Sequence, residues 1–155
     1  MTVSVRVEGF KELEAELGKL TKAAGKGVLR RALKRAAEPL AETARNLAPR
    51  GDTAEDRLAE SIAVSTRLSK RQAKMHRKMF KDDRASVEMF VGPGPDPAAW
   101  NQEFGNINHG PQSFMRPAWQ AEQAGMLERL KADLWTEVEK AVARAERKAA
   151  RQRRQ

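Results

Sequence analysis

The side chains that most often bind metals or act as nucleophiles are scarce in this chain, which contains two histidines, His76 and His109, and no cysteine. His76 stands among Lys74, Arg77 and Lys78, and these cations would repel a metal ion. A zinc site needs three or four ligands, and neither histidine has suitable neighbours. The sequence therefore predicts no metal site.

Other catalytic motifs are also missing from the sequence. Gly92 and Gly94 resemble part of a phosphate-binding loop, but no Gly-Lys-Ser/Thr follows, and the neighbouring prolines lack N–H donors. Glu12, Glu14 and Glu16 lie close together, but on the polar face of a predicted helix, where solvation explains them. No serine follows the strand–turn–helix pattern of hydrolases. We therefore predict a protein that is not an enzyme and binds no cofactor.

The scarce aromatic residues gather instead in one segment, "EFGNINHGPQSFMRPAWQ" at 103–120, together with a histidine, a methionine and two prolines. Such a segment either covers the core of its own subunit or forms a surface for another protein. Both roles can coexist, and the sequence alone leaves them open.

Hydrophobic periodicity predicts the elements around this segment. Apolar residues alternate with polar ones at 2–7, 62–67 and 86–91, which is typical of half-buried strands. Three- and four-residue spacing predicts a helix from Phe10 to about Gly25, and a second helix from Val28 to Leu47 that is kinked at Pro39 or lacks one hydrogen bond there. A short helix, 98–104, should end at Gly105 in the left-handed conformation.

The final helix should begin near Pro117, because proline suits the first helical turn. Trp119, Met126, Leu127, Leu130, Leu134, Val138, Ala141 and Ala145 mark its apolar side. Unbroken to the end of the chain, it would be about 55 Å long. Beyond Val142 that side offers only alanine, so the end should project or fray.

These elements predict an α+β fold, in which a small antiparallel sheet packs against helices and a long C-terminal helix follows. The sheet would combine the N-terminal strand with a long-looped hairpin. We expect one domain over residues 1–145 and a basic tail over 146–155. The chain has no apolar run near the ~20 residues that span a membrane and no signal-peptide pattern, so we expect a soluble cytoplasmic protein.

The net charge of +9 is concentrated in two segments. Residues 70–84 contain seven basic and two acidic side chains, and residues 140–155 contain seven basic and one acidic side chain. Such patches suit phosphate backbones or acidic protein surfaces, although a solvated helix face explains them equally well. The candidate contacts are Lys70, Arg71, Lys74, Arg77, Lys78, Lys81, Arg151, Arg153 and Arg154. We expect residues 70–81, in part helical, to form a mobile surface loop that orders on a partner.

Four motifs in register resemble one family over about residues 8–130. They are "LKRAAEPLAETARNLAP" at 33–49, "LAESI" at 58–62, "VGP" at 91–93, and the 103–118 segment with its Glu-Phe-Gly, His109 and Phe-Met-Arg-Pro-Ala. This order resembles the head–tail connector or tail-completion (neck) proteins of long-tailed, lambda-like phages. Ser113 departs from the family, which commonly has a second proline there.

The resemblance implies a structural virion protein that is assembled in the host cytoplasm and located in the phage neck. It would form a homo-oligomeric ring, hexameric because the tail tube is six-fold, on the tail-tube protein and below the head connector or stopper, with a channel for DNA. The alternative hypothesis is a basic nucleic-acid-binding protein that uses the segments 70–84 and 140–155, although no recognition motif is visible.

The predicted interface comprises Glu103, Phe104, Gly105, His109, Gln112, Phe114, Met115, Arg116, Pro117 and Trp119. Phe104 and Phe114 would be its anchors, and Gly105 and Pro117 would set its shape. We expect Phe114 to serve folding more than assembly. We expect Glu103 and His109 to serve assembly, because polar side chains have little reason to be buried within their own subunit.

Overall fold

The computed structural model describes residues 10–50, 56–81, 87–95 and 97–153. Its elements, in chain order, are α1 (Phe10–Gly18), α2 (Lys22–Leu47), α3 (Asp56–Ser61), β1 (Ala63–Ser65), α4 (Lys70–Met79), β2 (Phe90–Gly92), α5 (Pro97–Phe104) and α6 (Met115–Gln152). The predicted α+β class is confirmed. The predicted strand at 2–7 lies outside the described residues.

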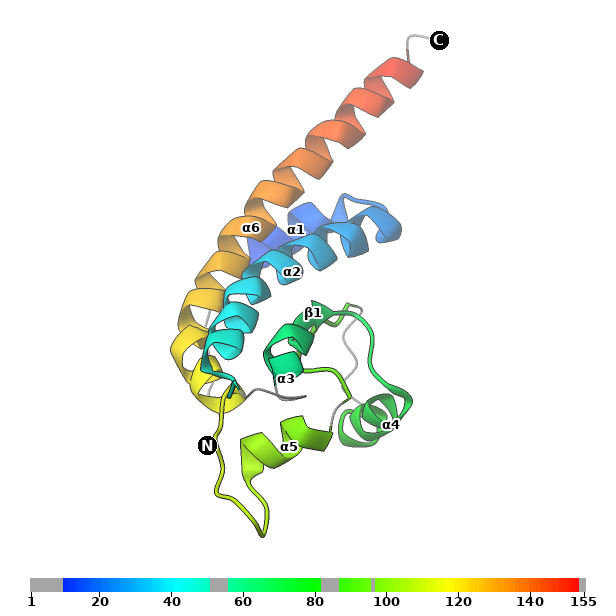
Figure 1. Ribbon diagram of the computed structural model, residues 1–155. Helices are drawn as coiled ribbons and strands as arrows, with labels where there is room; N and C mark the ends of the chain where they lie inside the picture. Colours follow the sequence, from blue (N-terminus) through cyan, green and yellow to red (C-terminus); the bar gives the residue numbers. More distant parts are fainter. Residues whose placement is uncertain (1–9, 51–55, 82–86, 96, 154–155) are drawn as a thin grey trace.

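The two long helices α2 and α6 pack side by side and form the centre of the molecule (Figure 1). Near the N-terminal end of α6, they enclose a core together with α3 and α5. The buried members of this core are Leu40, Ala41, Ala44, Ala48, Leu58, Ile62, Ala99, Phe114 and Ala118. Alanines on α2 allow close approach, so that one large ring, that of Phe114, fills the space between the helices.

A second core lies further along the same pair, where α1 covers α6. Its buried members are Leu13, Val28, Ala32, Leu134 and Val138. Beside it, Glu137 of α6 is only 8% exposed and accepts hydrogen bonds from Arg31 Nε and Arg35 Nη2 of α2, both at 2.8 Å. The hydrogen bond from Arg31 is the largest cause of a lowered Glu137 pKa, which keeps this carboxylate charged.

We predict that Glu137→Gln lowers the free energy of unfolding by about 1–3 kcal/mol, because it weakens two charge-assisted hydrogen bonds between α2 and α6. Denaturant unfolding of the purified variant measures this loss. The matched control is Glu139→Gln on the same helix. Glu139 is exposed and has no ion pair with any described residue, so its replacement should change stability by about 0.5 kcal/mol or less. Equal losses in both variants would contradict the role of Glu137.

The two short strands form an antiparallel pair in the register Ala63↔Gly92, Val64↔Val91 and Ser65↔Phe90. This confirms the predicted hairpin, although each strand is shorter than predicted. Val64 and Val91 pack against the core beside α2. Arg45 of α2 donates from Nε to the carbonyl of Ile62 at 2.9 Å, which fixes the start of the hairpin on the helix.

The break between the first two helices was predicted in the wrong place. It lies between Gly18 and Lys22, and both Gly25 and Gly27 are inside α2. Thr21 is the N-cap, and its side chain accepts from the N–H of Ala24. A capping threonine stabilises a helix start, whereas glycine inside a helix costs only about 1 kcal/mol. α2 also continues through Pro39.

Residues 70–79 form the helix α4, in agreement with the expectation that this segment is in part helical. Ser69 and Gln72 make a reciprocal capping box, in which Ser69 Oγ accepts from the N–H of Gln72 and Gln72 Oε1 accepts from the N–H of Ser69. No residue of this helix is buried. His76 packs its ring against Phe80 and Phe90, with centroid distances of 4.9 and 5.2 Å, and thereby attaches α4 to the hairpin.

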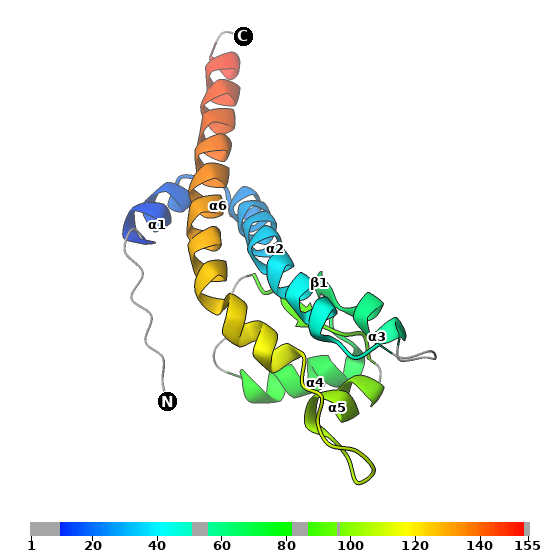
Figure 2. The same ribbon diagram turned by 60° about the vertical axis from the view of Figure 1, so that its left-hand side comes forward.

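The end of α6 projects from the rest of the protein, as predicted. Its last turns extend past both α1 and α2 in the two views of Figures 1 and 2. Residues 144–153 are all exposed. None of the helices in the described part of the chain is long and apolar enough to cross a membrane.

Candidate interface around the α5–α6 loop

A single carboxylate joins the end of α5 to the start of α6. Glu103 Oε2 accepts from the backbone N–H groups of Phe114 and Met115 at 2.8 and 2.9 Å. Its Oε1 accepts from the N–H and the Nε of Arg116 at 3.1 and 3.2 Å. Phe114 is the N-cap of α6 and has no polar side chain to cap the helix itself. Glu103 therefore caps α6 from outside.

This cap satisfies the free donors of the first turn. A helix leaves its first N–H groups without intrahelical partners. Here Glu103 accepts from the groups at 114, 115 and 116, residue 117 is a proline with no N–H, and Ala118 donates to the carbonyl of Phe114. Pro117 is in the first turn, as predicted, and it removes the one donor that the carboxylate does not reach.

Burial raises the pKa of Glu103, but the hydrogen bonds from Met115, Phe114 and Arg116 outweigh it, so the pKa lies below its ordinary value. The positive end of the helix dipole favours the same charged form. Glu103 is only 6% exposed, and the expectation that it would not be buried in its own subunit is wrong. Burying a carboxylate is costly, but the N–H groups of Phe114, Met115 and Arg116 compensate for this cost.

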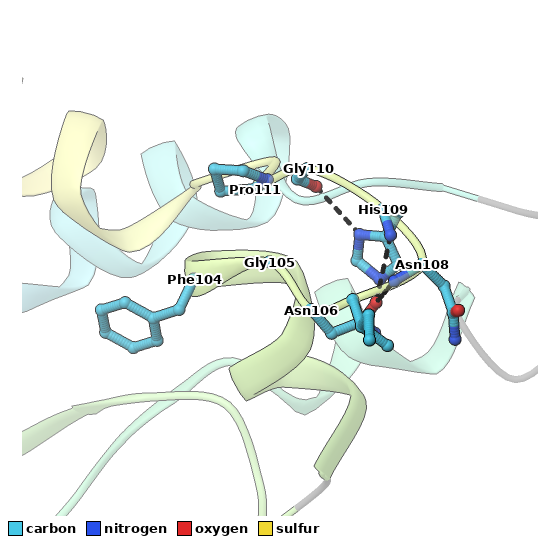
Figure 3. Close-up of a pocket in the computed structure, with 8 residues that line it drawn as sticks. Phe104, Gly105, Asn106, Asn108, His109, Gly110 and Pro111 are labelled. Carbon is cyan, nitrogen blue, oxygen red and sulfur yellow. Dashed lines mark hydrogen bonds between the residues drawn. The ribbon is translucent and has the colours of Figure 1, made fainter.

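The loop between α5 and α6 is closed by hydrogen bonds at its base and at its tip. At the base, Gln112 donates its N–H to the carbonyl of Gln102 at 2.7 Å, and Ser113 Oγ donates to the carbonyl of Glu103 at 2.7 Å. At the tip, Asn106 donates its N–H to the carbonyl of His109 at 3.0 Å. Figure 3 shows the Asn106 side chain turned toward the backbone of His109, whose ring lies against the carbonyl of Gly110. The loop is therefore an ordered projection.

Gly105 turns the chain out of α5 with φ of +77°, as predicted. A Cβ atom there would lie 2.9 Å from the nitrogen of Pro111, so an L-residue meets both backbone strain and a clash. We predict that Gly105→Ala lowers the free energy of unfolding by about 1–3 kcal/mol. The matched control is Gly110→Ala, because a Cβ at Gly110 would meet nothing within 4 Å and its φ is ordinary. Thermal unfolding of both variants measures the difference in stability. Equal melting temperatures for Gly105→Ala and Gly110→Ala would contradict the prediction.

The predicted interface residues separate into an inner and an outer group. In the inner group, Phe114 is fully buried, and Met115 packs against the core. Phe114 is therefore a core residue, which agrees with the expectation that it serves folding. Pro117 is half-buried.

The outer group consists of exposed residues on the loop and beside it. Phe104 is 49% exposed, and its ring packs against that of Trp100 in a tilted arrangement with 4.4 Å between centroids. The Arg116 guanidinium lies 5.1 Å from the centre of the Phe104 ring. Ile107, at the tip of the loop, is 99% exposed. Of the other predicted residues, His109 and Gln112 are exposed, and Trp119 is 47% exposed although it was predicted on the apolar side of α6.

Trp100 and Ile107 were missing from the predicted set. Trp100 stands four residues before Phe104, so both lie on one face of a short helix, and this spacing was visible in the sequence. Ile107 is flanked by Asn106 and Asn108, an apolar residue in a polar turn. We name Trp100, Phe104, Ile107 and Trp119 the outer apolar group.

The predicted basic contacts lie at two separate ends of the molecule. Lys70, Arg71, Lys74, Arg77 and Lys78 are exposed on α4, with Lys81 just beyond it. Arg151 and Arg153 are at the far end of α6, and Arg154 lies outside the described residues. In Figures 1 and 2, α4 and the end of α6 lie at opposite ends of the protein. They cannot act as one continuous patch within a single subunit.

Within the described ranges, no group of three or more His, Cys, Asp or Glu side chains is arranged to hold a metal ion. An open depression of about 540 Å³ is lined by Phe104–Pro111. It contains no pair of groups suited to acid–base or nucleophilic chemistry, since His109 is its one titratable side chain.

Comparison with known proteins identifies the family of this chain. No curated protein and no solved structure matches the chain. Residues 11–105 match the model of a family described as "Bacteriophage HK97-gp10, putative tail-component". This stretch runs from α1 to the glycine that ends α5, and it covers more than half of the chain. A phage tail component has a structural role, contacts other tail and virion proteins, and is part of the virion. The chain belongs to this HK97-gp10-like family of phage tail components.

Proposed function

We propose that the protein forms a closed ring at the top of the tail tube, where it completes the tail and joins it to the head connector while leaving a channel for DNA. Membership of a phage tail-component family supports the general role. The neck position, the six copies and the neighbours above and below follow from the resemblance of the sequence to neck proteins.

One observation carries the proposal, namely the full exposure of Ile107 on an ordered loop. An apolar side chain at the tip of a projection contributes nothing to the stability of its own subunit. Trp100 and Phe104 widen the apolar surface at the base of the same loop. Exposed aromatic and apolar residues that cluster in this way mark protein–protein contacts. The neighbouring subunit of the ring is the partner we propose for this surface.

The test is complementation of a phage that lacks this protein with the variant Ile107→Ser. We expect the melting temperature of the purified variant to stay within about 1 °C, because Ile107 is exposed. We expect the yield of joined particles to fall at least about tenfold, since removing a central apolar anchor costs an interface about 1.4 kcal/mol or more per subunit pair. Unjoined heads and tails should accumulate in electron micrographs.

The matched control is Asn108→Ala in the same turn, where only the exposed amide is removed. It should support normal joining. Normal joining with Ile107→Ser would contradict the proposed contact. Quantitative mass spectrometry of purified virions tests the ring itself, for which we expect about six copies per tail; a single copy per tail would exclude it.

A further inference from the structure

The projecting end of α6 carries five cations on one face, at Lys140, Arg144, Arg147, Lys148 and Arg151. Their spacing of four, three, one and three residues keeps them within one side of a helix of 3.6 residues per turn. All five are exposed. We name them the α6 basic stripe, which extends over about 16 Å of the helix.

None of the five cations makes an ion pair with any residue in the described ranges. The two nearby acids, Glu139 and Glu146, are displaced by more than about 100° around the helix from the centre of the stripe. In contrast, Arg31, Arg35 and Arg129 of the packed region are each bound to a carboxylate of α6. The stripe is therefore a positive surface whose five cations are not neutralised by ion pairs with described residues, although Glu139 lines the same depression as Lys140, Arg144 and Arg147.

The side chains around the stripe distinguish between two possible partners, an acidic protein surface and a phosphate backbone. Between residues 140 and 151, the apolar residues are alanines and Val142 alone, so no large anchor is present. The residues that dominate protein interfaces are Trp, Tyr and Arg, and of these the stripe contains Arg but no aromatic residue. Binding to a phosphate backbone needs none, because the release of counterions drives it. Between residues 140 and 151 there is also no Asn or Gln, the side chains that read adenine.

The basic residues of α4 form the natural comparison. Lys70, Lys74, Arg77, Lys78 and Lys81 have the same spacing along the chain as the α6 basic stripe. Their helix, however, also exposes apolar residues, with Met75 51% and Met79 72% exposed. α4 lies on the loop side of the molecule, away from the tip of α6 (Figures 1 and 2). Its surface suits a protein, whereas that of the α6 tip suits phosphates.

We propose that the α6 basic stripe is a sequence-independent binding site for the phosphate backbone of double-stranded DNA. The inference rests on the proposed function only in that DNA is the polyanion that passes through the neck. The stripe lies at the end of the protein opposite the α5–α6 loop, so ring contacts through that loop leave it accessible.

The test measures binding of the purified full chain to a fluorescent duplex of about 30 base pairs and arbitrary sequence, over a salt range of about 50 to 200 mM. The stripe variant is K140Q, R144Q, R147Q, K148Q and R151Q. The control variant is K70Q, K74Q, R77Q, K78Q and K81Q, which removes the same charge at the same spacing. We expect the stripe variant to bind at least about tenfold more weakly, and the slope of its salt dependence to fall by about 0.9 for each phosphate that is no longer neutralised. The control should bind within about threefold of the parent.

Equal weakening of both variants would show that net charge alone drives binding, and it would overturn the proposal. So would a stripe variant that binds like the parent. Polyglutamate at equal charge concentration should not displace the duplex, and efficient displacement would assign the stripe to acidic proteins instead. The Ile107→Ser variant distinguishes a failure of this inference from a failure of the proposed function. It should bind DNA normally even though it fails to join heads to tails.

Discussion

Replacement of Phe114 by alanine is expected to lower the free energy of unfolding by about 3–5 kcal/mol. Phe114 has no exposed surface and lies between α2, α3, α5 and α6 in the largest described core. Its neighbours are mainly alanines and short aliphatic residues held on helices, so they cannot move to fill the space that the ring leaves. Chemical denaturation of the purified variant measures the loss, which is a large part of the stability of a domain of this size.

The matched control is Phe104→Ala, because it removes the same side chain from the same segment. Phe104 is half exposed, so we expect a loss of about 1 kcal/mol or less, from its contacts with Trp100 and Arg116. Phe104→Ala should instead weaken assembly. A Phe114→Ala protein that melted at the parent temperature but failed to assemble would contradict this prediction. It would show that Phe114 is needed for assembly and not for the stability of the subunit.

The second large effect is expected from Glu103→Ala, which should lower the free energy of unfolding by about 2–4 kcal/mol. This loss has two causes, because the variant removes the cap of α6 and leaves a buried N–H without an acceptor. The N–H of Phe114 is the buried one, and those of Met115 and Arg116 are closer to solvent. Glu103→Gln keeps one acceptor oxygen and should lose less. A variant with alanine at 103 that is as stable as the parent would contradict the cap.

The same carboxylate should make stability depend on acid. Because the pKa of Glu103 is lowered in the folded state, its stabilisation is present above the unfolded value of about 4.3 and disappears as the pH falls through the folded pKa. The pKa values of Glu122 and Glu137 shift in the same direction. We therefore expect unfolding to become easier below about pH 4.5, with a weaker pH dependence in Glu103→Gln. Identical pH profiles for the two proteins would show that Glu103 does not contribute.

Local rules were sufficient for much of this fold. Four features were predicted from neighbouring residues in the sequence, and each is present. They are the glycine at the end of α5, the proline at the start of α6, the alternating residues of the hairpin, and the last helix's projecting end, which has no large apolar residues. The start of α2 differs from the prediction because the side chain of Thr21 caps the helix, and Gly25 and Gly27 do not interrupt it. For the segment at 70–81, which was expected to be in part helical, the start of the helix has a signal in the sequence, the Ser69–Gln72 spacing of a capping box.

The role of Glu103 was beyond such rules. Its partners are 11–13 residues away, and a helix whose N-cap is phenylalanine gives no sign of where its cap comes from. The sequence shows a charged residue near aromatics, which is equally typical of an interface. The division of the segment into inner and outer residues also depends on how α5 and α6 meet, and this follows from the core around Phe114.

The α5–α6 loop is closed by hydrogen bonds both at its base and at its tip. The residues that stabilise the fold are therefore separate from the exposed residues at the tip. The bonds at Glu103 and Gln112 anchor the base, so residues 106–110 can change without altering the helices below. Exposed turns of this kind tolerate exchange and insertion. Related phages could therefore acquire a different docking specificity by substituting a few tip residues while inheriting an unchanged scaffold. An epitope tag inserted after Asn108 should likewise give a stable, labelled protein.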